Sequence, residues 1–169
     1  MADFLTEIER CIPSLRRYAR ALMRDRERAD DLVQDCLERA ISRRRLWRPS
    51  GSLRAWLFTI LHNLYANEVR RQSTQPGLVS VDEIDMTLSR PEEQTDGLIM
   101  RDVSAALDRL ATEQREVLLL VALEGLSYAE VAAVQGVPIG TVMSRLSRAR
   151  ERLGVLLDGD PASRIRRIK

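Results

Sequence analysis

Apolar residues recur at intervals of three and four along most of the chain, a spacing that places them on one face of a helix. One stripe covers residues 4–22, where Pro13 is expected to split the helix and to lie in the first turn of its longer part. A second stripe covers residues 29–41, and a third begins at Leu53 after a Pro-Ser-Gly-Ser break and ends near residues 70–71. Inward positions of the third stripe are predicted to be Leu53, Trp56, Leu57, Ile60, Leu61 and Leu64.

The helical pattern is lost between residues 72 and 95. This stretch is polar, and its prolines and acidic residues are Pro76, Asp82, Glu83, Asp85, Pro91, Glu92 and Glu93. Such a segment buries too little apolar surface to fold alone. It therefore predicts a flexible, acidic linker between two separable helical domains.

Helical stripes return after the linker. One covers residues 99–110, and another follows Thr112, a candidate helix cap, and stops at Gly125. Ser127 and Glu130 have the spacing of a capping box, in which each side chain satisfies a free N–H group of the other residue. The final helix is expected to follow Pro138. Its core positions are predicted to be Ile139, Val142, Leu146, Ala149, Leu153 and Leu156.

These patterns predict an all-α protein made of two small helical domains joined by a flexible linker, the second domain containing a helix-turn-helix. The expected boundaries are residues 1–72 for the first domain, 73–95 for the linker, 96–158 for the second domain and 159–169 for a basic tail. A length of 169 residues is compatible with two domains of this size.

The composition of the chain excludes several classes of function. No apolar run approaches the roughly 20 residues of a membrane-spanning helix, and the N-terminus lacks a signal pattern, so we expect a cytoplasmic protein without membrane insertion. Cys11, Cys36 and the single histidine, His62, are scattered, so no metal site and no cofactor are predicted. Both cysteines fall on apolar stripes and are expected to be core thiols. Lys169 is the only lysine, so arginine supplies nearly all of the positive charge.

The segment LSYAEVAAVQGVPIGTVMSRLSRARERL, residues 126–153, is typical of a helix-turn-helix, whose second helix enters the major groove of DNA. Hydroxyl and guanidinium groups, which suit base edges and phosphates, lie on its outer face. Gly136 permits the turn, and Gly140 removes side-chain bulk where the backbone approaches DNA. A helical hairpin with a solvated basic face is the alternative. The predicted DNA-binding residues are Thr141, Ser144, Arg145, Ser147, Arg148 and Arg152.

The second stripe has an acidic outer face formed by Asp31, Gln34, Asp35 and Glu38. A solvated face is the common explanation for such a pattern, and a docking surface for a basic partner is the functional one. A di-metal helix bundle would also use carboxylates, but it needs Glu-x-x-His motifs, which this chain lacks.

A third candidate lies between residues 46 and 71. Amide side chains read base edges, arginines hold phosphates, and aromatic rings stack on unpaired bases. Core packing is the alternative for the aromatic residues, and it is preferred for Trp56 but not for Trp47, which lies in a loop. The predicted set is Trp47, His62, Asn63, Asn67, Arg70 and Arg71.

Three segments in this order resemble the sigma-70 family of RNA polymerase sigma factors, in its extracytoplasmic-function (ECF) subgroup. They are DDLVQDCLERA, LRAWLFTILHNLYANEVRR and, after the linker, the helix-turn-helix segment quoted above. The resemblance covers about residues 13–157. It implies a two-domain protein that binds core RNA polymerase and promoter DNA, has an anti-sigma partner, and is not an enzyme.

The resemblance also implies individual roles. The helix around Asp31, Gln34 and Asp35 would dock on the clamp helices of core polymerase. Residues 46–71 would open and read the −10 element, with Asn63 lining the pocket for a flipped-out base. The helix-turn-helix would read the −35 element. Met143 departs from the family pattern, which often has a basic residue there, and Ser147 replaces an aromatic residue of some relatives.

Two other functions remain as alternatives. A stand-alone helix-turn-helix regulator would bind duplex DNA unaided, but it would leave the acidic face and the Asn63 and Asn67 face without a role. A helical metal enzyme or nuclease would need clustered metal ligands, and the chain has one histidine and no acidic cluster with metal spacing.

Overall fold

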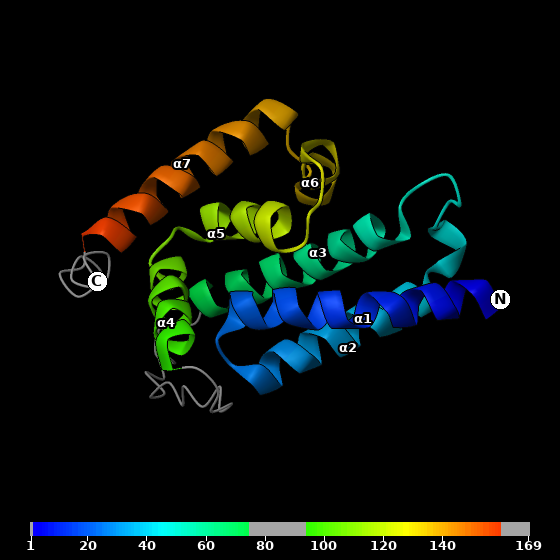
Figure 1. The fold of residues 1–169 in the computed structure, drawn as a ribbon. Helices are drawn as coiled ribbons and strands as arrows, with labels where there is room; N and C mark the ends of the chain where they lie inside the picture. Colours follow the sequence, from blue (N-terminus) through cyan, green and yellow to red (C-terminus); the bar gives the residue numbers. More distant parts are fainter. Residues whose placement is uncertain (1, 75–93, 160–169) are drawn as a thin grey trace.

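The computed structural model describes residues 2–74 and 94–159, and every regular element in these ranges is helical. The first domain comprises α1 (Ala2–Met23), α2 (Arg26–Ser42), the short 3-10 helix η1 (Arg44–Leu46) and α3 (Leu53–Thr74) (Figure 1). The second comprises α4 (Gln94–Asp108), α5 (Thr112–Leu118), the π-helical turn η2 (Leu119–Leu123), α6 (Tyr128–Gln135) and α7 (Ile139–Asp158). This confirms the all-α, two-domain prediction. No helix in the described ranges is long and apolar enough to cross a membrane.

Two stretches on which the sequence made predictions fall outside the described residues. They are most of the predicted linker, residues 75–93, and the basic tail from residue 160. The predicted start of the second domain at residue 96 lies two residues inside α4, which begins at Gln94.

Helices α1, α2 and α3 pack side by side through an aliphatic core that includes Leu15, Leu57 and Leu61, all fully shielded from solvent. The rings of Tyr18 and Phe58 meet edge to face in this core, with their centroids 5.3 Å apart. Edge-to-face contacts suit the ring quadrupoles and add to the apolar burial. The contact therefore fixes α1 against α3.

Helix α1 is continuous through Pro13, so the predicted split at this residue is wrong. Proline removes the N–H that would donate to the carbonyl of Glu9, four residues earlier. Pro13 and Glu9 are both exposed, so water can replace the missing hydrogen bond. Ile8 before the proline and Leu15 after it are both buried in the same core, which keeps the two halves of the helix aligned.

Side chains cap two helices of the first domain. The Asp25 carboxylate accepts a hydrogen bond from the Arg28 N–H at 3.1 Å at the start of α2, and the Ser52 hydroxyl accepts one from the Ala55 N–H at 3.2 Å at the start of α3. Helix α3 is turned slightly from the predicted stripe, so that Trp56 is only half-buried. Its buried residues are Leu53, Leu57, Phe58, Leu61, Leu64 and Tyr65.

The second domain is built on α5, α6 and α7. Val142, Leu146 and Ala149 of α7 are buried, as the stripe predicted, whereas Leu153 and Leu156 are half-buried and Ile139 is 46% exposed. Helix α5 starts after Ala111, without a side-chain cap, so Thr112 does not have the capping role that the sequence suggested.

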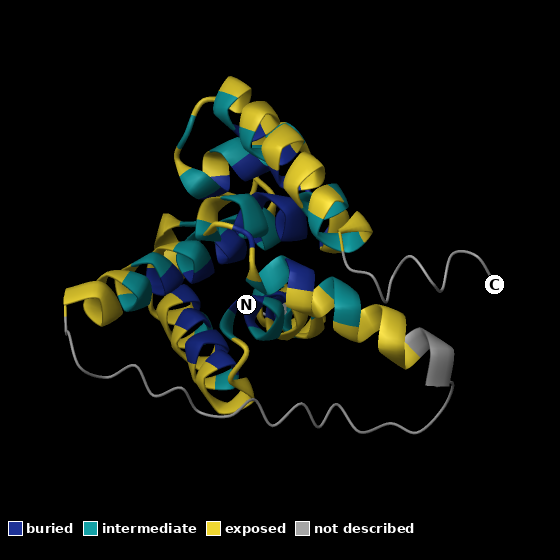
Figure 2. Cartoon of the chain, turned by 90° about the vertical axis from the view of Figure 1, so that its left-hand side faces the viewer, coloured by how far each residue is buried: buried dark blue, intermediate teal, exposed yellow. Residues whose placement is uncertain are grey.

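The two domains pack against each other. Helix α6 lies against α3, and the segment of α5 and η2 runs along α1 and α3 (Figure 1). One continuous hydrophobic core joins buried residues of both domains, and Figure 2 shows the dark buried positions turned toward this contact. The described residues thus form a closed arrangement, although the linker pattern had suggested domains that separate readily.

Candidate nucleic-acid and polymerase interfaces

The helix-turn-helix of the second domain has the local structure that the sequence predicted. The Ser127 hydroxyl accepts from the Glu130 N–H at 3.1 Å, and the Glu130 carboxylate accepts from the Ser127 N–H at 2.9 Å, which completes a capping box. Gly136 ends α6 at a φ of 64°, a left-handed conformation that glycine adopts without steric cost. These contacts fix the angle at which α7 leaves the turn.

Helix α7 presents one polar face to solvent. Ser144, Ser147, Arg148 and Arg152 are exposed on it, while Thr141 is half-buried. Arg145 differs from the prediction, because only 23% of its side chain is exposed.

Arg145 is turned toward the body of the second domain. It donates to the Gln135 side chain at 3.4 Å and lies 3.8 Å from the Glu113 carboxylate. It thereby ties α7 to α5 and α6 within the described structure. Arg148 and Arg152, by contrast, point away from the core and are the arginines best placed to meet DNA.

The amide and arginine side chains predicted on α3 are accessible. Asn63 and Asn67, one helical turn apart, are exposed, and so are Arg70 and Arg71 further along. Glu68, which follows Asn67 in the sequence, accepts hydrogen bonds from both Arg28 and Arg71. Desolvation opposes ionisation of Glu68, but the hydrogen bonds from these two arginines outweigh it and lower the pKa of its carboxyl group.

The two predicted base-stacking rings are covered. Trp47 is half-buried and packs against Phe4 of α1, with ring centroids 5.6 Å apart. His62 is only 16% exposed, and its Nδ1 atom lies 3.1 Å from the Glu116 carboxylate of the second domain. Neither ring is open to a base in this arrangement, so the six predicted residues do not form one exposed surface.

The acidic face of α2 is open. Asp31, Gln34, Asp35 and Glu38 are all exposed on the side opposite the buried Leu32 and Cys36. A weak hydrogen bond of 3.4 Å joins Gln34 to Glu38.

Asp30, beside this face, has a different role. The Arg20 guanidinium donates to both of its carboxylate oxygens at 3.0 and 3.1 Å and lowers the pKa of the Asp30 carboxyl group. Asp30 therefore joins α1 to α2, while Asp31 and Asp35 are exposed to solvent.

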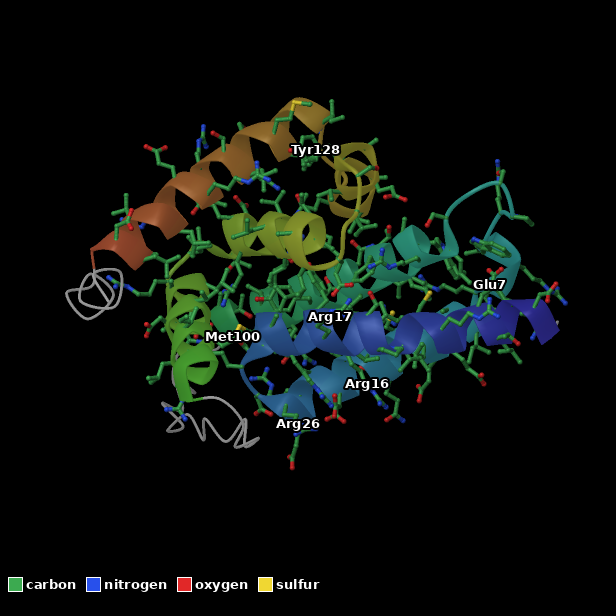
Figure 3. The ribbon with its side chains drawn as sticks, in the orientation of Figure 1. Glu7, Arg16, Arg17, Arg26, Met100 and Tyr128 are labelled. Carbon is green, nitrogen blue, oxygen red and sulfur yellow. The ribbon has the colours of Figure 1, made fainter. Side chains whose placement is uncertain are left out.

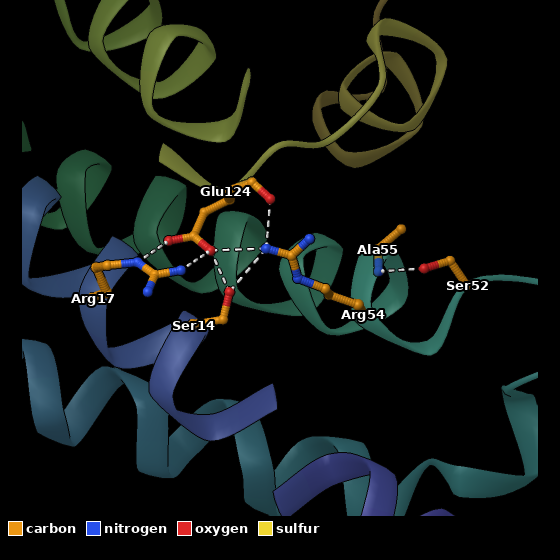
Figure 4. Close-up of polar contacts among 6 residues, drawn as sticks. All are labelled: Ser14, Arg17, Ser52, Arg54, Ala55 and Glu124. Atoms are coloured by element: carbon orange, nitrogen blue, oxygen red, sulfur yellow. Dashed lines mark hydrogen bonds and ion pairs between the residues drawn. The ribbon is translucent and has the colours of Figure 1, made fainter. Parts of the chain in front are cut away.

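Sequence reasoning missed a polar cluster between the domains. Glu124, whose side chain is fully shielded, lies between Arg17 of α1 and Arg54 of α3, and it also accepts from the Ser14 hydroxyl (Figure 4). All of these partners are at least 70 residues away in the sequence, so nothing in the local sequence distinguished Glu124.

The backbone turn at Gly125 determines where the Glu124 side chain lies. Gly125 has a φ of 66°, and its N–H donates to the Val121 carbonyl while the Leu126 N–H donates to the Leu120 carbonyl. The bond from the Gly125 N–H to the Val121 carbonyl is the αL pattern that closes a helix C-terminus. It turns the chain sharply after η2 and leaves Glu124 against the first domain.

Comparison with known proteins matches both domains. Residues 8–62 match the family described as the Sigma2 domain of PhyR, and residues 100–153 match Sigma-70, region 4. Over 160 residues the chain is 41% identical to the ECF RNA polymerase sigma factor EcfG of Rhodopseudomonas palustris (strain TIE-1), which covers 92% of this chain and 86% of that protein. This chain belongs to the ECF family of RNA polymerase sigma factors.

Other relatives and solved structures are similar to this sigma factor over most of its length. The ECF RNA polymerase sigma factor SigC of Mycobacterium tuberculosis is 36% identical over 148 residues, with 83% of this chain and 75% of that protein covered. Among solved structures, the sigma factor RpoE in complex with the anti-sigma factor NepR from Bartonella quintana has a TM-score of 0.79 at 34% identity, covering 95% and 99% of the two chains. CnrH in complex with the cytosolic domain of CnrY has a TM-score of 0.70 at 30% identity, covering 93% and 88%.

The family assigns a name to each half of this sigma factor. Helices α1 to α3 form its region 2 domain, and α4 to α7 form its region 4 domain. Met143 is 48% exposed on α7 beside Ser144. It adds an apolar group to the outer face of that helix.

Proposed function

We propose that this sigma factor binds core RNA polymerase through the acidic face of α2 and directs promoter-specific initiation, without catalysing a reaction of its own. Asn63 and Asn67 of α3, with Arg70 and Arg71, read and hold the −10 element. Ser144, Arg148 and neighbouring residues of α7 read the −35 element.

One observation carries this proposal: a single chain exposes an acidic helix face on one domain and a basic recognition helix on the other. Asp31 and Asp35 of α2 lie in the region 2 domain, and Arg148 and Arg152 of α7 lie in the region 4 domain. Acidic surfaces suit a basic protein partner, and arginines on a helix-turn-helix suit DNA. A protein that joins polymerase to promoter needs both surfaces at once.

An anti-sigma protein is the third partner that we propose. The similar structures of RpoE and CnrH were each solved with a protein partner, NepR and the cytosolic domain of CnrY respectively. Because both resemble this chain over more than nine-tenths of its length, a protein partner of this kind is the corresponding expectation here.

Core binding in the absence of DNA separates this function from that of a stand-alone regulator. We expect the fluorescently labelled chain to bind purified core RNA polymerase tightly, and to bind duplex promoter DNA only weakly until polymerase is added. Anisotropy titrations with each component measure both affinities. Tight binding to a duplex promoter without polymerase, together with no affinity for core enzyme, would favour the regulator instead.

A further inference from the structure

The site around Glu124 is built as a binding site for an anion. Arg17 donates from Nε and Nη2 to the two carboxylate oxygens of Glu124 at 2.9 and 3.0 Å, a bidentate contact. Arg54 donates to the same carboxylate at 2.8 Å and to the main-chain carbonyl of Glu124 at 2.6 Å. Ser14 adds a hydroxyl donor (Figure 4). All three donors belong to the region 2 domain, and the anion belongs to the region 4 domain.

Two of the three donors, Ser14 and Arg54, are held in place from within region 2. The Arg54 guanidinium lies 5.5 Å from the centre of the Phe58 ring, a cation–π distance, and it also donates to the Ser14 hydroxyl at 3.0 Å. Phe58 is fixed in turn by the buried Tyr18. The positions of Ser14 and Arg54 therefore do not depend on Glu124 alone, and the site is expected to persist when the domains separate.

A second acidic residue repeats the arrangement along α3. His62 follows Arg54 by eight residues, and it meets Glu116, which precedes Glu124 by eight residues. Eight residues of helix span about 12 Å. Two carboxylates of region 4 therefore contact the same helix of region 2, α3: Glu124 contacts Arg54, and Glu116 contacts His62.

Two anions spaced along one helix are what a nucleic-acid strand also supplies. Bidentate arginine donors fit a phosphate as well as they fit a carboxylate. When region 4 moves away, Arg17 and Arg54 are left close together without the Glu124 counter-charge, and their mutual repulsion favours capture of another anion. Asn63 and Asn67, the proposed −10 readers, lie on this same α3.

We infer that Ser14, Arg17 and Arg54 form a phosphate-binding site for the melted promoter strand, and that Glu124 occupies this site in the closed chain. The inference rests on the proposed function. Region 4 then competes with DNA for region 2: Glu124 covers the phosphate site, Glu116 covers His62, and separation of the domains uncovers both. The acidic face of α2 is exposed throughout, so polymerase can bind before the site opens.

Charge substitutions on the two sides of the cluster test this inference, because only the arginine substitutions are expected to weaken DNA binding. The variants are Arg17→Ala, Arg54→Ala and Glu124→Ala, with Arg16→Ala as the control. Arg16 is the adjacent exposed arginine of α1, so its replacement removes the same charge outside the cluster (Figure 3). Each variant is assembled with core polymerase and titrated with a labelled promoter fragment that carries an unpaired −10 bubble. The promoter is one that the parent holoenzyme transcribes.

The arginine variants are expected to bind the bubble promoter roughly tenfold more weakly than the parent, the size of one charged hydrogen-bonding contact. The slope of log affinity against log salt should fall by about 0.7 for each single-strand phosphate that the variant no longer neutralises. Glu124→Ala and Arg16→Ala should stay within about twofold of the parent. In the free chain, by contrast, Arg17→Ala, Arg54→Ala and Glu124→Ala should all separate the domains, measured by energy transfer between dyes on α2 and α7.

Three results would overturn the inference. Arginine variants that bind the bubble as Arg16→Ala does would show that no phosphate occupies the site. An equal loss of affinity for Glu124→Ala and Arg54→Ala would show that the cluster acts only by holding the domains together. If a labelled poly-glutamate peptide, but not bubble DNA, distinguishes Arg54→Ala from Arg16→Ala, the occupant is an acidic protein segment instead.

A Glu124→Gln variant, which keeps the side-chain shape, replaces Glu124→Ala if that protein does not fold. Absence of transcription by the parent holoenzyme would count against the proposed function and not against this site.

Discussion

The His62 ring of region 2 and the Glu116 carboxylate of region 4 lie 3.1 Å apart, and both are shielded from solvent, with 16% and 6% of their side chains exposed. His62 is one of the residues proposed to meet unpaired promoter bases. A base cannot stack on the ring while Glu116 covers it. We therefore expect the two domains to separate before His62 contacts DNA, whereas Asn63 beside it is already exposed.

Reversal of the acidic face of α2 should weaken polymerase binding without unfolding the protein. Asp31 and Asp35 are exposed, so Asp31→Arg with Asp35→Arg is expected to change the free energy of unfolding by only about 0.5 kcal/mol. The affinity for core polymerase should fall markedly, because a basic partner surface would then meet arginine. Anisotropy titration with core enzyme measures the affinity, and urea unfolding measures the stability.

Glu9→Arg is a suitable control for this double variant, because it reverses an exposed charge on α1 instead of α2. It should bind core polymerase as the parent does. Unchanged binding by the Asp31→Arg, Asp35→Arg protein would show that α2 is a solvated face without a docking role.

Asn63→Ala should impair promoter opening more than promoter association. Asn63 is exposed on α3, so its replacement should leave the fold intact and the holoenzyme should assemble normally. An amide that binds a flipped-out base acts only after the strands have separated. Permanganate reactivity of unpaired thymines should fall in the variant holoenzyme, while the initial association measured by filter binding stays near the parent value. Equal reductions in both assays would indicate a structural role.

Arg148 and Arg152, both exposed on α7, should differ in what they contribute. Arg148→Ala is expected to relax base preference at one −35 position by about 1–3 kcal/mol, the worth of a bidentate contact to guanine. Arg152→Ala, one turn further along, should weaken binding to all sequences alike and reduce the salt dependence, as expected for a phosphate contact. Selection from a randomised −35 library by each holoenzyme distinguishes the two. An unchanged preference profile for Arg148→Ala would remove this residue from the base-reading set.

The two cysteines should react differently with alkylating reagents. Cys36 is fully buried, donates from Sγ to the Leu57 carbonyl at 3.4 Å, and has a thiol pKa raised by burial to about 12. Burial also raises the pKa of Cys11, but this thiol is only half-buried. The folded state thus favours the protonated Cys36 thiol, a preference fully present below pH 9 and lost as the pH rises toward about 12.

At pH 8.5, iodoacetamide is therefore expected to modify Cys11 and to spare Cys36 until urea unfolds the chain. Mass spectrometry of tryptic peptides measures both sites, and the unfolded protein serves as the control in which both react. Equal alkylation of both residues in the folded protein would show that the α2–α3 contact around Cys36 opens readily.

Local signals in the sequence were sufficient for the helices and the helix-turn-helix. Periodicity predicted the buried residues of α2 and α7, and the Ser127–Glu130 capping box and the Gly136 turn need only neighbouring residues to form. The prediction for Pro13 was wrong because the effect of proline is local, whereas the core on both sides of it holds the helix straight.

The contact between the domains was not predictable in the same way. Glu124 meets Arg17 and Ser14 across more than 100 residues of sequence, and periodicity contains no information about such pairs. For the same reason, Arg145 looked like a free DNA-binding arginine, although it is turned toward Gln135. Exposure of a helix face can be predicted from its own sequence only where no other element covers it.

Transcription reconstituted from purified components tests the central claim most directly. The chain is added to core RNA polymerase with fragmented genomic DNA as template, and the 5′ ends of the transcripts are mapped. We predict discrete start sites preceded by shared −10 and −35 sequences, which appear only when this chain is present and disappear with the Asp31→Arg, Asp35→Arg variant. Start sites that are the same with and without the chain would contradict its assignment as a promoter-directing subunit.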